Sequence, residues 1–183
     1  ELYNKTIQLD PKFTESYFNL GNIYYDQEKF LQAIKIYKKA ININPLYYAP
    51  REKLSYTLLT LLRFKEGFKE YEWRIKNKPK HSYQDLNLKS NLWNGENLNG
   101  KKILILSEQG IGDTIQFARY IYELQEKYDV KIIFRTHKKL IHLFNNSNLN
   151  IIGEEDEILT HHYHIYLMSL PKFYYQREKK LLK

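Results

Sequence analysis

An interval of 34 residues recurs through the first part of this chain. Pro11, Pro45 and Pro79 keep this spacing. Aromatic and leucine positions repeat with the same interval: Tyr3, Tyr37 and Tyr71; Leu20 and Leu54; Phe30 and Phe64. A fixed period of this length indicates a stack of supersecondary units that bury their apolar faces against one another. The period therefore predicts five antiparallel helices within residues 1–75, with a proline closing each unit because proline cannot continue a helix.

The middle unit, Thr14–Tyr47, resembles a tetratricopeptide repeat. Residue types expected in that repeat stand at its signature positions: Tyr17, Leu20, Gly21, Tyr24, Phe30, Ala33, Tyr37, Ala40 and Pro45. The small residues Gly21 and Ala33 allow two helices to cross closely, and the large side chains fill the space between the helices. The resemblance implies repeats over residues 1–79, one partial unit and two full ones.

The flanking units are less complete than the middle one. Residues 1–13 supply a single helix, and Arg74 stands where the third unit would usually have a small residue. Repeats of this kind bind a protein or peptide partner on a concave face built from the first helix of each unit. Asn19, Asn22 and Tyr25 lie off the core positions of that helix in the middle unit, and we expect them to contact the partner.

The pattern changes after residue 79. Residues 80–100 hold scattered polar residues without sustained periodicity, which is typical of a linker. Apolar runs then predict strands near 102–107, 130–135 and 150–152, and a further run at Tyr163–Leu167 is compatible with a fourth. Helical spacing separates the first two runs, and a short helix is expected at His137–Phe144. Residues 101–183 therefore favour a Rossmann-like parallel sheet.

A glycine-containing turn, Gly110–Asp113, follows the first of these strands. Ligands of open α/β sheets bind outside the carboxyl ends of the strands, and glycines let the backbone approach a ligand closely. The turn is not a dinucleotide fingerprint, because Ile115 occupies the place of the third glycine. A purely structural interpretation is that the glycines form the turn while Asp113 caps the helix.

Residues 108–120 read EQGIGDTIQFARY. They resemble the EQGxGDxIQFxRY motif of bacterial proteins that join tetratricopeptide repeats to a heptosyltransferase-like GT-B glycosyltransferase domain. Shorter pieces agree with the same family in order along the chain: Phe68–Arg74, Leu92–Gly95, Leu98–Lys101 and Leu167–Pro171. The resemblance implies that residues 101–183 are the N-terminal Rossmann half of a GT-B domain.

This resemblance also implies a reaction, in which a sugar moves from a nucleotide-sugar donor to an acceptor hydroxyl on a glycan. Asp113 matches the aspartate proposed as the general base. The ligand-binding positions would be Glu108, Gln109, Gly110, Gly112, Thr114, Gln116, Arg119 and His164. Gln116 and Arg119 share a helix face, and Arg119 has pairing with Glu123 as a structural alternative. No cofactor or metal is implied, since the nucleotide sugar is a substrate and His162 with His164 lacks a third ligand.

Some features depart from the family. His162 stands where aspartate is common, and the residues after Pro171 lack the expected Gly-Thr. The second Rossmann half, which holds most donor contacts in the family, is not in this sequence. We therefore expect the 183 residues alone to be inactive. The alternative is a non-catalytic tetratricopeptide-repeat scaffold whose α/β domain is degenerate.

Composition excludes several other classes of protein. The absence of cysteine rules out disulfide scaffolds, thiolate zinc sites and a cysteine nucleophile. The net charge of +8 comes from single lysines spaced along helical patterns, without an Arg-rich block, so we expect no nucleic-acid partner. Apolar runs are too short for a transmembrane segment, and we expect a cytoplasmic protein. The sequence opens at Glu1 instead of Met, which indicates a fragment.

Overall fold

The computed structural model describes residues 2–76, 86, 88–144 and 148–175. The chain divides into two compact units, Glu1–Pro79 and Lys80–Lys183. Each unit contains a hydrophobic core of its own. The first unit is helical and the second contains a parallel sheet, so the predicted class of helical hairpins followed by an α/β unit is confirmed. Pro79 and part of the expected linker, residues 80–85 and 87, lie outside the described residues.

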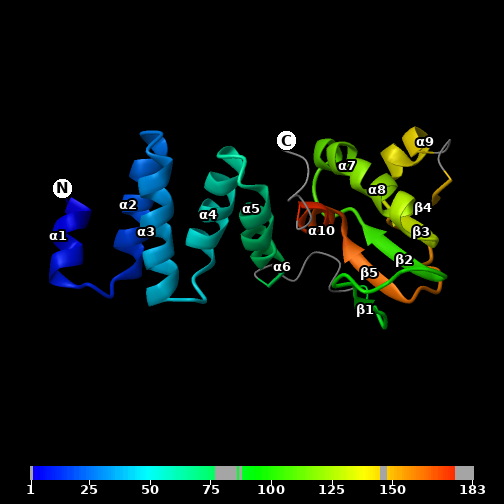
Figure 1. Ribbon diagram of the computed structural model, residues 1–183, viewed down its shortest axis with the longest axis horizontal. Coiled ribbons are helices and arrows are strands. Elements are labelled where there is room, and N and C mark those ends of the chain that lie inside the picture. The colour runs from blue at the N-terminus through cyan, green and yellow to red at the C-terminus, as the bar shows by residue number, and fades with distance from the viewer. Residues whose placement is uncertain (1, 77–85, 87, 145–147, 176–183) are drawn as a thin grey trace. The chain divides into compact units, whose positions relative to one another are not determined.

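Successive helices of the first unit run in opposite directions, as Figure 1 shows. Their bounds are α1 Leu2–Leu9, α2 Thr14–Asp26, α3 Phe30–Ile43, α4 Tyr48–Thr60, α5 Phe64–Tyr71 and the short α6 Trp73–Lys76. Helix α2 packs on α3, α4 packs on α5, and α3 joins the two hairpins by contacting α4. The five helices expected from the repeat period are confirmed. The period did not predict the break at Glu72 that separates α6 from α5.

Tyr37 fills the space between α2 and α3. Its side chain is fully buried, and its hydroxyl donates a hydrogen bond of 2.8 Å to Asn22 Oδ1. A Cβ atom at Gly21 would lie 2.5 Å from Tyr37 Cε1, which is closer than carbon atoms can approach. Glycine is therefore required at this crossing because the buried ring occupies the position of any side chain.

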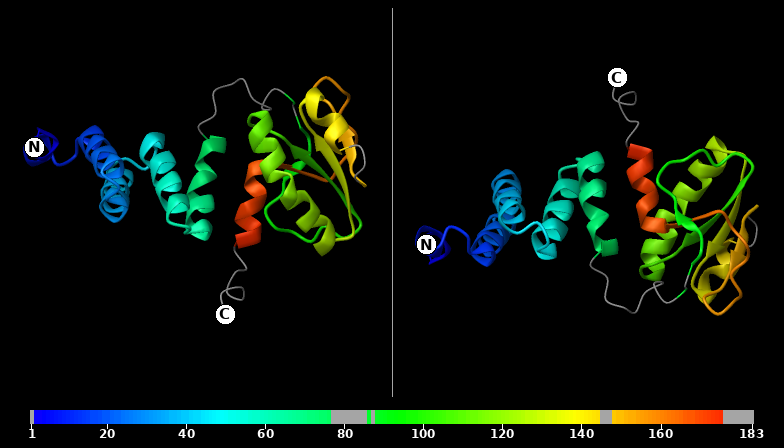
Figure 2. Two further views of the ribbon diagram at one scale, coloured as in Figure 1. Left: turned by 90° about the horizontal axis from the view of Figure 1, so that it is seen from above. Right: turned by 90° about the horizontal axis from the view of Figure 1, so that it is seen from below.

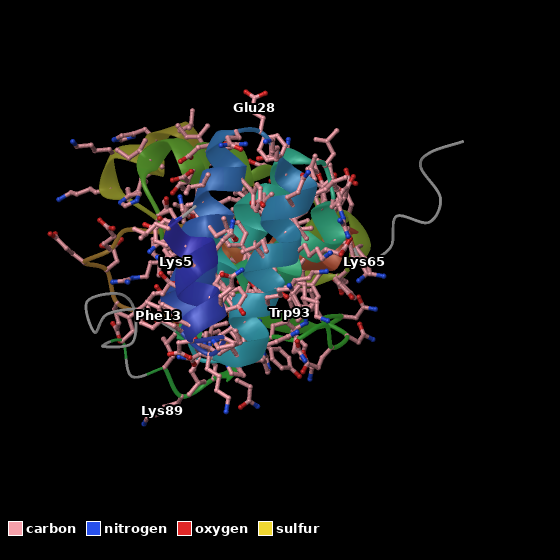
Figure 3. All side chains as sticks on the ribbon, turned by 90° about the vertical axis from the view of Figure 1, so that its left-hand side faces the viewer. Lys5, Phe13, Glu28, Lys65, Lys89 and Trp93 are labelled. Carbon is pink, nitrogen blue, oxygen red and sulfur yellow. The ribbon has the colours of Figure 1, made fainter. Side chains whose placement is uncertain are left out.

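The turns inside the two hairpins share an unusual backbone conformation. Glu28, between α2 and α3, has φ 58°, and Leu62, between α4 and α5, has φ 57°. The Glu28 side chain points away from the helices (Figure 3), and Leu62 is also exposed. Side chains other than glycine rarely adopt this left-handed region, so each turn carries local backbone strain.

The second unit is built on five strands in the order β1-β5-β2-β3-β4, all parallel to their neighbours. Their bounds are β1 Asn91–Leu92, β2 Lys101–Leu106, β3 Val130–Arg135, β4 Asn150–Ile152 and β5 Tyr163–Tyr166. The predicted parallel pairing of the first two long strands is confirmed. Strand β1 differs from the expectation of a linker, because residues 91–92 pair with β5 and extend the sheet.

Helices cover the sheet through one main hydrophobic cluster. They are α7 Ile111–Phe117, α8 Arg119–Lys127, α9 Ile141–Phe144 and α10 Leu170–Tyr175, with 3₁₀ turns at Lys138–Leu140 and Leu167–Ser169. Helix α10 lies beside α8 (Figure 2). Trp93, which follows β1, is 2% exposed and packs 4.4 Å from the ring of Phe173 in α10. The residues after β1 thus belong to the core of this unit.

Among the residues that the structure describes, no helix combines the length and apolar character needed to cross a membrane.

Candidate functional site at the carboxyl edge of the sheet

Three neighbouring strands end at the same edge of the sheet. Leu106, the last residue of β2, is in register with Arg135 at the end of β3. Arg135 is in register with Ile152 at the end of β4. The segment 108–113, which we call the glycine loop, follows β2 at this edge and continues into α7. Parallel sheets bind their ligands at the carboxyl ends of strands, so the glycine loop occupies the favoured position for a site.

Four glycines of the second unit fall into two groups. Gly95 and Gly100 have φ values of 103° and 69°, a region that other residues rarely adopt. Gly110 has φ −61°, and Gly112 has no positive φ either. A Cβ at Gly112 would meet no atom within 4 Å, and one at Gly110 would meet Asp113 Oδ2 at an ordinary 3.7 Å. The fold therefore requires glycine at 95 and 100, whereas at 110 and 112 it leaves open space beside the backbone.

Asp113 does not cap α7, so the structural interpretation of this residue is wrong. Gly110 occupies the N-cap position, and Asp113 is the third residue of the helix, without a side-chain cap bond. The helix begins early because the Gly110 carbonyl accepts hydrogen bonds of 3.0 Å from both the backbone N–H and the hydroxyl of Thr114. Asp113 is exposed, and its carboxylate forms no hydrogen bond or ion pair with any described residue.

The remaining predicted residues near the glycine loop differ in how far they are exposed to solvent. Glu108 and Gln109 are half-buried, Thr114 is buried, and Gln116 is exposed on α7. Arg119 begins α8 and donates a hydrogen bond of 3.0 Å to the Tyr120 hydroxyl, above whose ring it lies. This bond raises the pKa of Arg119. Arg119 thus joins the tyrosines between α8 and α10, and the expected pairing with Glu123 is wrong.

His164 lies within β5, away from the strand end that the glycine loop follows. It is in register with Leu104 of β2, and its Nδ1 is 2.8 Å from Ser90 Oγ. Burial lowers the pKa of His164, and the nearby His161 lowers it further. His162 Nδ1 accepts a hydrogen bond of 2.9 Å from the Lys102 backbone N–H. Within the described part of the chain, no group of three or more potential metal ligands comes together.

Residues that were not singled out as ligand positions also surround the glycine loop. His137, after β3, has Nε2 2.7 Å from the Gln109 carbonyl oxygen and Nδ1 2.9 Å from Glu154 Oε1. Arg135 donates to the backbone carbonyl of Glu154. Glu154 opens an exposed turn after β4, and both its backbone carbonyl and its carboxylate contact residues at the sheet edge. The available signal was positional, because both His137 and Glu154 closely follow strands.

The three residues expected to contact a partner have different surroundings in α2. Asn22 Oδ1 accepts the hydrogen bond from Tyr37, and Tyr25 packs edge-on against Phe30 at a centroid distance of 5.4 Å. Tyr25 packs against the hydrophobic core of the hairpins, so its expected position off the core is wrong. Asn22 is half-buried outside that core, and contact of either residue with a partner stays a prediction. Asn19 is half-buried and makes no hydrogen bond with a described residue.

Comparison with known proteins supports the identity of the hairpins. The tetratricopeptide repeat family model matches residues 14–47. Protein FlbA of Caulobacter vibrioides is 26% identical over 131 residues, covering 68% of this chain and 21% of FlbA. Human tetratricopeptide repeat protein 6 is 42% identical over 43 residues, covering 24% of this chain and 8% of that protein. This chain thus spans about a fifth of the length of FlbA.

A solved structure, a mutant of the O-GlcNAc transferase from Thermobaculum terrenum, aligns with a TM-score of 0.37 and 15% sequence identity. The alignment covers 87% of this chain and 31% of that one. The family match falls on α2 and α3, whose crossing at Gly21 and Tyr37 has the close packing that the repeat requires. Residues 14–47 of this chain accordingly match one tetratricopeptide repeat.

Proposed function

We propose that the second unit is the N-terminal half of a heptosyltransferase-like GT-B glycosyltransferase domain and that the repeats bind a protein or peptide partner. The full-length protein would transfer a sugar from a nucleotide-sugar donor to an acceptor hydroxyl on a glycan. The proposal is supported by the resemblance of residues 108–120 to the family motif. It is also supported by the position of that motif at the carboxyl edge of a parallel sheet.

The observation that carries the proposal is the state of Asp113. Its carboxylate is exposed in the first turn of α7 and makes no hydrogen bond or ion pair with the described residues. Gly112, on the same turn, borders space that the fold does not fill. A carboxylate without a structural role beside open backbone is suited to contact a substrate.

The proposed reaction assigns Asp113 the role of general base. The acceptor oxygen forms a bond to the anomeric carbon of the donor sugar while the bond from that carbon to the diphosphate oxygen breaks. The acceptor proton passes to Asp113, and the nucleoside diphosphate leaves with the bonding electron pair.

Asp113→Asn in the full-length protein tests this proposal. The amide cannot accept a proton, and we expect the transfer rate to fall by roughly 10²–10⁴. The melting temperature should stay unchanged because the Asp113 side chain makes no contact that the amide would remove. Asp129→Asn is the matched control, since Asp129 is also exposed but precedes β3 at the opposite edge of the sheet. Equal turnover by wild type and Asp113→Asn would refute the assignment.

The family match of residues 14–47 favours a second candidate function, a non-catalytic scaffold with a degenerate α/β domain. Such a scaffold would bind its partner through the repeats and would transfer no sugar. Full-length protein that binds a partner but shows no sugar transfer with any nucleotide-sugar donor would support this candidate over the enzyme.

A further inference from the structure

A single side chain, His137, joins two loops at the carboxyl edge of the sheet. Its Nε2 lies 2.7 Å from the carbonyl oxygen of Gln109 in the glycine loop, and its Nδ1 lies 2.9 Å from Glu154 Oε1 after β4. The His137 side chain is 26% exposed, so water competes only in part for these contacts. The ring therefore connects the chain after β2 to the chain after β4.

Both partners of the ring are hydrogen-bond acceptors. A backbone carbonyl oxygen cannot donate, and an ionised carboxylate accepts only. Neutral imidazole carries one N–H, whereas the imidazolium ion carries two. Hydrogen bonds to Gln109 and to Glu154 at the same time therefore require the doubly protonated ring.

The acceptor after β4 is itself held in place. Arg135, which is 7% exposed at the end of β3, donates to the Glu154 backbone carbonyl. The preceding Gly153 donates its backbone N–H to Asp156 Oδ2 at 2.6 Å. The turn after β4 is therefore fixed at both points. Because Glu154 lies in this turn, it gives the His137 ring an anchored partner on the side away from the glycine loop.

We propose that His137 is the positioning residue of the glycine loop and holds the loop only in its protonated form. This inference rests on the proposed function in so far as the loop presents Asp113 to a substrate. With the ring protonated, the Gln109 carbonyl is fixed two residues ahead of the first turn of α7. Loss of one ring proton leaves a single N–H for two acceptors, so the loop is released as the pH rises.

Other charged residues belong to the segments that neighbour the ring. They are Glu108 and Asp113 of the glycine loop, Arg135 and Lys138 beside β3, and Glu154, Glu155 and Asp156 after β4. Lys138 is 83% exposed and lies 3.9 Å from Glu155, which is 88% exposed, so water screens this pair. Glu154 is the carboxylate in contact with the ring.

Residue-specific NMR on the full chain tests the inference. We expect the ¹⁵N signals of the His137 ring to report two protonated nitrogens at low pH and one at high pH. The amide signals of Gly110 and Gly112 should shift with the same midpoint. The Thr114 amide donates a hydrogen bond to the Gly110 carbonyl. Its protection factor against hydrogen exchange should fall by about tenfold above that midpoint, the factor associated with one charge-assisted hydrogen bond.

Variants separate the positioning role from simple packing. In Glu154→Gln the side-chain amide can donate a hydrogen bond to a neutral His137 ring. The Thr114 protection factor should therefore persist to higher pH and should depend less on the protonation of the ring. In His137→Gln the glycine signals should lose the titration, because a carboxamide does not gain or lose a proton in this pH range. Glu155→Gln, the adjacent control, should behave as wild type because Glu155 faces Lys138.

The outcomes distinguish this inference from the proposed function. The positioning role would be overturned if the Gly110 and Gly112 amide signals did not shift with the His137 titration, or if Thr114 protection in Glu154→Gln varied with pH as in wild type. Either result would leave the assignment of Asp113 unchanged. Full transfer activity in Asp113→Asn together with a pH-dependent loop would refute the reaction and retain the positioning role of His137.

Discussion

The hairpins α2–α3 and α4–α5 both cross closely, but their glycines lie on opposite helices. In the first hairpin, Gly21 on α2 leaves room for the Tyr37 ring of α3. In the second, Gly67 on α5 leaves room for Leu59 of α4, whose Cδ2 would lie 2.7 Å from a Cβ at residue 67. Ser55 takes the position equivalent to Gly21. Each crossing therefore combines a glycine on one helix with another small buried residue on the other, Ala33 in the first hairpin and Ser55 in the second.

The two hairpins also differ in how they end. Helix α3 continues to Ile43, with Ala40 fully buried in its last turns. The position equivalent to Ala40 is Arg74, which is 5% exposed and bonds to Glu72 Oε1 at 2.8 Å and to the Tyr71 carbonyl. Helix α5 is interrupted at Glu72, before this bulky residue. A bulky, ion-paired arginine at this position is consistent with a terminal repeat, onto which no further unit packs.

Gly21→Ala should give the largest loss of stability among changes at these crossings. Its Cβ would lie 2.5 Å from Tyr37 Cε1, and Tyr37 cannot move because it is fully buried and bonded to Asn22. We expect a loss of about 2–3 kcal/mol in urea unfolding followed by circular dichroism, after the gain in helix propensity. Gly112→Ala is the matched control in open space and should lose nothing. Equal stabilities for the two variants would contradict the packing requirement.

Gly67→Ala should destabilise the second hairpin less than Gly21→Ala destabilises the first. The nearest atoms belong to the end of the Leu59 side chain, which can rotate, although the Leu59 backbone nitrogen at 3.2 Å limits the adjustment. We expect a loss of about 1–2 kcal/mol by the same unfolding measurement. A loss greater than that of Gly21→Ala would show that the leucine is as rigid as the tyrosine ring.

Ser55→Ala tests whether the second hairpin uses its polar residue as the first uses glycine. The Ser55 hydroxyl is buried and donates a hydrogen bond of 3.1 Å to the Gly67 carbonyl. Alanine fits the same space but removes the donor, so we expect a loss of about 1 kcal/mol. A variant as stable as wild type in urea would indicate that the hydroxyl contributes nothing to the crossing.

Leu62→Gly should produce the smallest effect, a gain in stability. Leu62 adopts φ 57° and is 72% exposed, so glycine relieves the backbone without removing a buried side chain. Relief of strain exceeds the added entropy of the unfolded chain by about 0.5 kcal/mol. Glu28→Gly should act alike in the first hairpin, and a rise in Tm for both variants would confirm that the turns are equivalent. A fall in Tm would contradict the strain.

The sequence predicted the elements whose signals are local or periodic. The repeat interval and its prolines indicated five helices, and the apolar run at 102–107 indicated the central strand. Strand β1 was missed because two residues carry no periodicity and pair with β5, about 70 positions later, only in the folded chain. The start of α7 was misplaced because Asp113 has the chemistry of a cap, although Gly110 with its extended backbone takes that position.

In the candidate site, too, some features could be predicted from the sequence and others are visible only in the structure. The motif in residues 108–120 and its position after a strand could be read directly, and the exposed Asp113 carboxylate agrees with a role outside packing. The contacts of His137 with Gln109 and Glu154 could not be read, because they join residues that follow different strands. A hydrogen bond between distant residues has no signature in either local sequence.

The sequence by itself determined that hairpins precede a parallel sheet, since periodicity and apolar runs are properties of neighbouring residues along the chain. Tertiary structure decided which helix supplies space at each crossing, because that depends on whether Tyr37 or Leu59 projects across it. It likewise decided that Asn22 supports Tyr37 and that His137 meets two acceptors. These outcomes depend on which groups the fold brings within a few ångströms, and no single segment encodes that distance.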